Sequence, residues 1–156
     1  MTEMLKFRKF LTAGGLAAVL LFAPSAQAAG DPVEAIKYRQ MVMSSNGAHI
    51  GAIAAVLKGK VPHGGHILGH ARAMHAASLM LDDIFPPGSD VGETRAKPEI
   101  WQQPEKFKAA IRALQTAVAG LVTAAESGDM GAIGDALGPV GKGCGGCHKP
   151  FRKPKE

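Results

Sequence analysis

The sequence predicts an all-α protein, an antiparallel four-helix bundle, on three observations. Alanine and glycine are abundant and aromatic residues make up only 5% of the 156 residues, which favours close-packed helices over a β-sandwich or barrel. Four segments carry apolar residues at alternating steps of three and four, which is the spacing of one face of a helix. Short links within each pair of segments predict antiparallel neighbours.

Residues 1–28 have the pattern of a secretory signal peptide rather than of a folded element. A basic start precedes an apolar run over residues 10–22, and Ala26-Gln27-Ala28 fits the small-x-small cleavage rule. The run contains a Gly-Gly pair and is shorter than the roughly 20 residues that a membrane span requires. We therefore expect an exported, periplasmic domain over residues 29–156, with no membrane span after cleavage.

The first helix is predicted over residues 31–58. Asp31-Pro32 supplies an N-cap followed by proline at the first helical position, and a basic turn with a later proline ends the segment. Asn46-Gly47 is a turn signal inside this helix. The apolar face is predicted to comprise Ile36, Gln40, Met43, Gly47, Ile50, Ala54 and Leu57.

Three further helices of about 20 to 28 residues are expected from the same periodicity, and lengths of roughly 30 to 40 Å let all four pack side by side. A long crossing loop over residues 86–103 separates the second helix from the third, with Trp101 closing its base, and Pro150 is expected to bend or fray the end of the fourth. The predicted core positions are Ile67, Ala71, Met74, Ser78, Leu81 and Phe85, then Phe107, Ile111, Leu114, Val118, Leu121 and Ala125, and finally Ile133, Leu137, Val140, Cys144, Cys147 and Phe151.

Charge and motif content exclude several classes of function. The excess of 18 Lys and Arg over 13 Asp and Glu is modest and spread along the chain, so no nucleic-acid surface is expected. The sequence shows no nucleophile with a matching base, no paired-carboxylate site and no phosphate-binding glycine loop. We therefore expect a protein that is not an enzyme.

Cys144-Gly-Gly-Cys147-His148 contains both cysteines of the chain. A zinc site would need a second pair of ligands, and a thioredoxin-like redox pair belongs beside a βαβ unit, which is missing. C-x-x-C-H is the attachment signature of c-type haem, which is fitted to exported proteins. Because residues three apart share one helix face, the motif predicts one covalent haem c held by Cys144 and Cys147, with His148 as the proximal iron ligand.

The surroundings of this motif are glycine-rich and basic. The glycines at positions 143, 145 and 146 are interpreted as allowing close approach of backbone and porphyrin. The positive charges are either a solvated face or a surface that steers an acidic partner. They belong to Lys142, Lys149, Arg152, Lys153 and Lys155.

The chain resembles the class II cytochromes c, the family of cytochrome c′ and its low-spin relatives, over essentially the whole of residues 29–156. The resemblance is carried by Tyr38-Arg39-Gln40 with Met43, by Lys97-Pro-Glu-Ile-Trp101, and by residues 140–148 with Phe151-Arg152. It implies a haem with Met43 on its distal face. It also implies that Arg39 lies near a haem propionate, whereas the alternative for this residue is a surface ion pair.

High-spin members of this family leave the iron five-coordinate, and low-spin members bind it through a methionine of the first helix. The small residues after Met43 resemble the low-spin branch, and a thioether is a soft ligand suited to haem iron. The sequence thus predicts Met43 as the distal iron ligand of a periplasmic electron carrier with redox partner proteins. The alternative is a five-coordinate haem that binds nitric oxide or carbon monoxide. A homodimer is left open.

The remaining histidines are expected on polar surfaces. His49 and His75 fall one position away from the apolar faces of their helices. His66 and His70 form an i, i+4 pair, with His63 nearby, that could in principle hold a surface metal. No carboxylate or cysteine completes that set, so a solvated polar face is the favoured interpretation.

Overall fold

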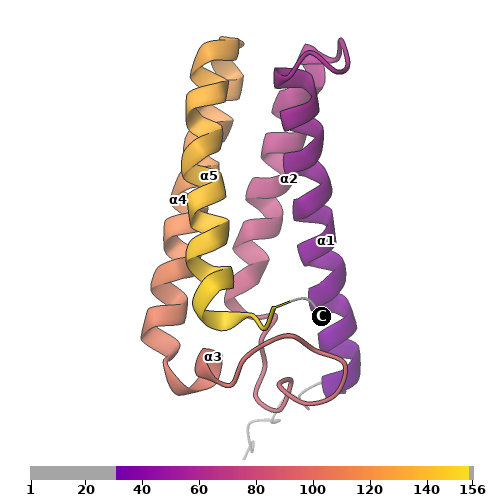
Figure 1. The fold of residues 1–156 in the computed structure, drawn as a ribbon, viewed down its shortest axis with the longest axis vertical. Coiled ribbons are helices and arrows are strands. Elements are labelled where there is room, and N and C mark those ends of the chain that lie inside the picture. Colours follow the sequence, from indigo (N-terminus) through magenta and orange to yellow (C-terminus); the bar gives the residue numbers. More distant parts are fainter. Residues whose placement is uncertain (1–30, 155–156) are drawn as a thin grey trace, which may run out of the picture.

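The computed structural model describes residues 31–154, and it is all-helical apart from turns, loops and one isolated β-bridge. Four long helices run side by side, with a loop and a short helix closing one end (Figure 1). Packing follows the order α1 on α2, α2 on α4, and α4 on α5, which confirms the predicted bundle. The signal peptide predicted over residues 1–28 lies outside the described residues. The helices are α1 (Pro32–Leu57), α2 (Ile67–Leu79), α3 (Glu99–Gln102), α4 (Pro104–Ser127) and α5 (Met130–Phe151).

Helix α1 begins as predicted, but a different row of residues is buried. The Asp31 side chain accepts a hydrogen bond from the Val33 backbone N–H at 2.9 Å, and the helix continues through the turn signal at residues 46–47. The predicted face is wrong by about one residue, because α1 packs on α2 while its neighbouring row faces a cavity. Gln40 and Gly47 are exposed, and Met43 is only half-buried. The buried residues are Ile36, Arg39, Val42, Ile53 and Val56.

The predicted core faces of the other three helices agree closely with the structure. All six predicted positions on α4 are buried, as are five of the six in the second segment. Helix α2 is nevertheless shorter than expected, with 13 residues, because the chain tightens into a 3-10 turn at Met80–Asp82. On α5, the predicted residues 137, 144 and 147 are half-buried, and the helix ends one residue after Pro150.

Arg39 fastens the long loop to α1. Its guanidinium is buried and donates hydrogen bonds of 2.9 Å to the Ser89 hydroxyl, the Ser89 carbonyl and the Thr94 hydroxyl. The same group lies 4.7 Å from the centroid of the Phe85 ring. Arg39 makes no ion pair with any residue of the described chain, so the alternative of a surface ion pair is wrong. Burial lowers the pKa of the guanidinium.

The other end of this loop is fastened to α5 and the C-terminal segment. The Lys97 N–H donates to the Phe151 carbonyl at 3.0 Å, and the Lys153 N–H donates to the Arg95 carbonyl at 2.8 Å. Trp101 is half-buried, and its indole N–H donates to the carbonyls of residues 85 and 86, so it closes the base of the loop as predicted. The loop therefore connects α1 to the end of α5.

Helices α4 and α5 approach each other closely at Gly143. A Cβ atom at this position would lie 3.0 Å from the Leu114 Cα and 3.2 Å from its Cδ1. The interpretation of Gly143 as making room for porphyrin is therefore wrong, because this glycine makes room for a neighbouring backbone. Gly145 and Gly146, by contrast, have nothing within 4 Å of an added Cβ.

Replacing Gly143 with alanine is expected to destabilise the bundle. Overpacking costs about 1–3 kcal/mol, which exceeds the roughly 0.5–1 kcal/mol that alanine gains over glycine in a helix. The matched control is Gly134→Ala on the same helix, where an added Cβ meets nothing within 4 Å and stability should rise. Denaturant unfolding of both variants measures the difference, and a Gly143→Ala protein as stable as Gly134→Ala would contradict it.

Arg39→Lys should also lower stability, by about 1–3 kcal/mol, because an ammonium cannot span the Ser89 and Thr94 acceptors as a planar guanidinium does. Arg72→Lys is the control, since Arg72 forms an exposed pair with Glu126 and its exchange should change stability by less than about 0.5 kcal/mol. Thermal or denaturant melts compare the two. An equal effect of both exchanges would show that the buried contacts contribute little.

Candidate haem site

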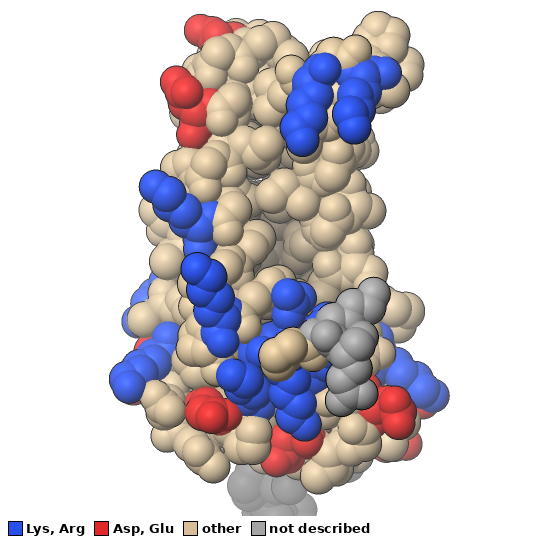
Figure 2. Space-filling view, in the orientation of Figure 1, with Lys and Arg blue, Asp and Glu red and all other residues tan. Residues whose placement is uncertain are grey.

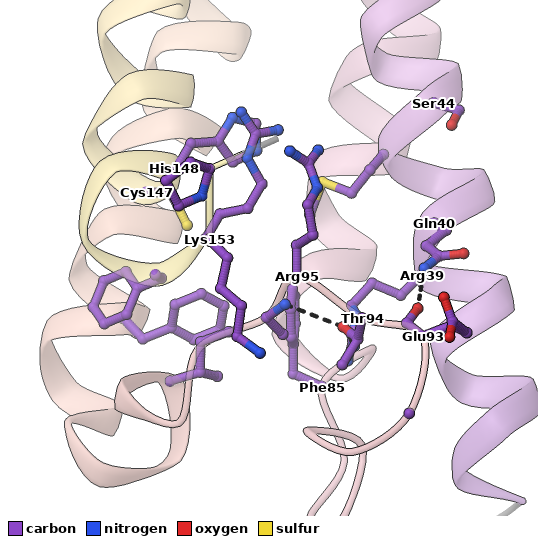
Figure 3. A pocket seen from close by; sticks show the side chains of 18 residues that line it. Arg39, Gln40, Ser44, Phe85, Glu93, Thr94, Arg95, Cys147, His148 and Lys153 are labelled. Carbon is purple, nitrogen blue, oxygen red and sulfur yellow. Dashed lines mark hydrogen bonds between the residues drawn. The ribbon is translucent and has the colours of Figure 1, made fainter. Parts of the chain in front are cut away.

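A cavity of about 770 Å³ lies between α1 and α5, and the long loop forms its floor. Figure 3 shows Gln40 and Ser44 on the α1 side, Cys147 and His148 on the α5 side, and Arg95 extending between them from the loop. The size falls within the range of about 300–1,000 Å³ that is usual for ligand and cofactor sites. The cavity is thus framed by elements that are far apart in the sequence.

Both cysteines of α5 are free, half-buried and packed against the hydrophobic core. Burial raises the pKa of both thiols, that of Cys147 to about 11, with the charge of Cys144 adding to the effect and that of Arg152 opposing it. No group of three or more potential metal-binding side chains gathers within residues 31–154, so the zinc alternative finds no support there.

His148 lies in the cavity wall beside Cys147 and is half-buried. Burial, followed by the positive charges of Arg152 and Arg95, lowers the pKa of its imidazole. The ring is therefore neutral at pH 7, which is the state that binds iron. The structure brings together two of the three residues predicted from the motif at the cavity surface, and the third, Cys144, lies one helical turn earlier.

Met43 lines the opposite wall, on α1, and also packs against the core. The sequence prediction that this side chain faces the haem side of α1 agrees with this position. Arg39 lines the cavity too, but its guanidinium is occupied by the loop contacts described above. Its contact with a haem propionate stays a prediction.

Positive charge surrounds the opening. Arg95, Arg152 and Lys153 all line the cavity, and Figure 2 shows Lys and Arg side chains gathered over this end of the molecule. Arg152 and Lys153 were predicted, whereas Arg95 was missed because it lies in a loop with no periodic pattern. The only sequence signal for it is its position just before the Lys97–Trp101 stretch. Lys155 lies outside the described residues.

These features fit a haem. Part of the cavity lining is apolar, and there Phe107 packs edge-to-face on Phe85 at 4.8 Å and on Phe151 at 5.1 Å between ring centroids. The basic residues at the rim match the negative charge of two propionates, and the thiols and imidazole come from one helix. Cys144, Cys147 and His148 are the residues that could hold the group and its iron.

The other histidines lie outside this site. None of His49, His63, His66, His70 and His75 lines the cavity. His63 stacks on His66, with 5.0 Å between ring centroids, and both side chains are exposed. His66 stacks on His63 and His70 contacts His49, and His63, His66 and His70 form no metal-binding group of three within the described part of the chain.

Comparisons with known proteins agree with this geometry. Residues 34–152 match the family described as Cytochrome C′. A cytochrome c′ of Rhodospirillum rubrum is 37% identical over 136 residues, which cover 86% of this chain and 92% of that protein.

Two solved structures of cytochrome c prime from Alcaligenes xylosoxidans are similar over their whole length. The nitric oxide complex of one variant is 33% identical, with a TM-score of 0.75, and covers 81% of this chain and 98% of that chain. A carbon monoxide-bound variant is 32% identical, with a TM-score of 0.74, and the match covers 80% of this chain and 98% of that chain. The matched residues 34–152 include the helical bundle and the C-terminal haem motif, and the chain belongs to the cytochrome c′ family, whose members carry a covalently attached haem c.

Proposed function

We propose that this protein binds nitric oxide or carbon monoxide at a five-coordinate haem held by His148. The observation that supports this most directly is the match, over nearly the full length of the relatives, to cytochromes c′ whose structures contain these two gases. This is the alternative that the sequence left open, and the comparisons favour it over methionine ligation. The low-spin branch finds no support in them.

In this proposal, the residues around the cavity have different roles. Cys144 and Cys147 anchor the haem to α5, and the neutral imidazole of His148 binds the iron on the proximal side. Met43 packs against the core and acts as an apolar wall on the distal side. Haem iron, when bound, supplies an open coordination position for a diatomic gas. The protein works by binding a ligand rather than by turnover.

A His–Met electron carrier is the second candidate, because Met43 lines the same cavity as His148. Its thioether would complete the coordination of the iron, and the basic rim would steer an acidic periplasmic redox partner. Export rests on the signal pattern of residues 1–28. None of the helices in residues 31–154 is long and apolar enough to cross a membrane. A homodimer remains compatible with both candidates.

The coordination state separates the two candidates. We expect the wild-type haem to be high-spin when oxidised and when reduced, and we expect the reduced protein to bind carbon monoxide readily. Met43→Ala should leave the spin state unchanged and accelerate gas binding, because the distal wall becomes smaller. Absorption spectra and stopped-flow mixing measure both. A low-spin wild type that becomes high-spin in Met43→Ala would instead establish methionine ligation and the electron carrier.

Attachment of the haem can be tested on the α5 motif. The Cys144→Ala/Cys147→Ala variant should retain no covalent haem, because it lacks both sulfur atoms that would form thioethers. Met43→Ala is the matched control, since it alters the cavity wall but leaves the motif intact. Haem staining after denaturing electrophoresis and acid-acetone extraction compares them. Covalent haem in the double variant would overturn the roles of both cysteines.

A further inference from the structure

A pair of histidines bridges α1 and α2 outside the haem cavity. The Nδ1 atoms of His49 and His70 lie 3.0 Å apart, and the ring centroids are 5.2 Å apart with the planes tilted by 48°. Both side chains are half-buried, and neither lines the cavity. One ring comes from each of the two helices, so the pair spans the contact between α1 and α2.

The two Nδ1 atoms lie within hydrogen-bond distance of each other. In the neutral pair, one Nδ1–H donates to the Nδ1 lone pair of the other ring, which requires opposite tautomers. Neither ring makes another side-chain hydrogen bond to a residue of the described chain. When both rings carry their proton on Nε2 instead, both Nδ1 lone pairs are free to bind a metal ion.

The separation of the two nitrogens fits adjacent ligands on one metal ion. With metal–nitrogen bonds of about 2.0–2.1 Å, two ligands at right angles lie about 2.9 Å apart, whereas a tetrahedral angle places them about 3.3 Å apart. The observed 3.0 Å is closer to the right angle. Square-planar and tetragonal coordination by nitrogen is typical of Cu²⁺ and Ni²⁺, and Cu²⁺ binds such sites most tightly among the first-row divalent ions.

The electrostatic surroundings do not oppose a cation. Helix α1 has no charged residue between Arg39 and Lys58. Arg72 is the single charged residue of α2 besides its histidines, and its guanidinium forms an ion pair with Glu126 at 3.0 Å. Gly69, next to His70, is exposed, and a Cβ added there meets nothing within 4 Å. Water can therefore complete the coordination of an ion on this side.

We propose that His49 and His70 form a two-histidine site that binds a divalent transition-metal ion, with Cu²⁺ preferred, across the contact between α1 and α2. The remaining coordination positions belong to water, because no third potential ligand gathers with this pair in the described residues. Such an ion exchanges with the solvent, in contrast to a closed four-ligand site. It also links two helices and so stabilises the folded state by mass action.

Calorimetric titration of Cu²⁺ into the untagged, haem-loaded protein tests the site. The haem-loaded form is used because both cysteines are then thioethers and do not compete for copper. We expect one copper ion to bind per chain in the wild type, and the same ion to be lost in His49→Gln and in His70→Gln. His75→Gln, another half-buried histidine of α2, is the matched control and should keep it. An amino-terminal copper site would contribute equally to all four proteins.

Thermal unfolding provides a second, independent measurement. Cu²⁺ should raise the Tm of the wild type and of His75→Gln, but not that of His49→Gln or His70→Gln. Circular dichroism and the haem absorption spectrum without copper establish that each variant is folded. Equal copper binding by all variants, or no binding by the wild type, would overturn the site. Loss of the ion in His63→Gln with retention in His49→Gln would also overturn it.

Discussion

The haem site depends on one buried guanidinium that has no carboxylate partner among the described residues. Arg39 is only 4% exposed, and its charge is balanced by two hydroxyls, a carbonyl and the face of Phe85. Charge-assisted hydrogen bonds of this kind are about twice as strong as neutral ones. Because the acceptors all belong to the loop, Arg39 fixes the cavity floor relative to α1. The loop in turn hydrogen-bonds to the end of α5, so the same loop positions both the α1 wall and the α5 wall of the cavity.

The cavity lies between α1 and α5, which are not packed closely on each other. Close packing of α4 against α5 at Gly143 and of α1 against α2 leaves the space between the outer helices to the cofactor. A haem held in this cavity would complete the hydrophobic core, and its burial would add to the stability of the folded state. Partly buried Met43 and Cys147 border this space and are the side chains that it would cover.

The periodic spacing of apolar residues explains which parts of the fold could be predicted from the sequence. On α4, every predicted core residue is buried, because both flanking helices pack on one face and a single stripe results. On α1, two adjacent rows of residues fit the same helical spacing. The position of the cavity determines that Arg39 and Val42 are buried, whereas Met43 is half-buried in the cavity wall. Arg95 and the His49–His70 contact were beyond prediction, since they depend on a loop path and on the relative rotation of two helices.

The relative positions of the predicted haem-attachment residues follow from the sequence spacing. Cys144, Cys147 and His148 lie on successive turns of one helix, so the helix determines how they are placed relative to each other. The distal side is different, because Met43 reaches the cavity from another helix and a thioether serves equally as core filler and as iron ligand. Its role is decided by the balance between an iron–sulfur bond and the packing that Met43 already makes against the core. The position of Met43 relative to α5 depends in part on the loop, which Arg39 joins to α1 and which hydrogen-bonds to the end of α5.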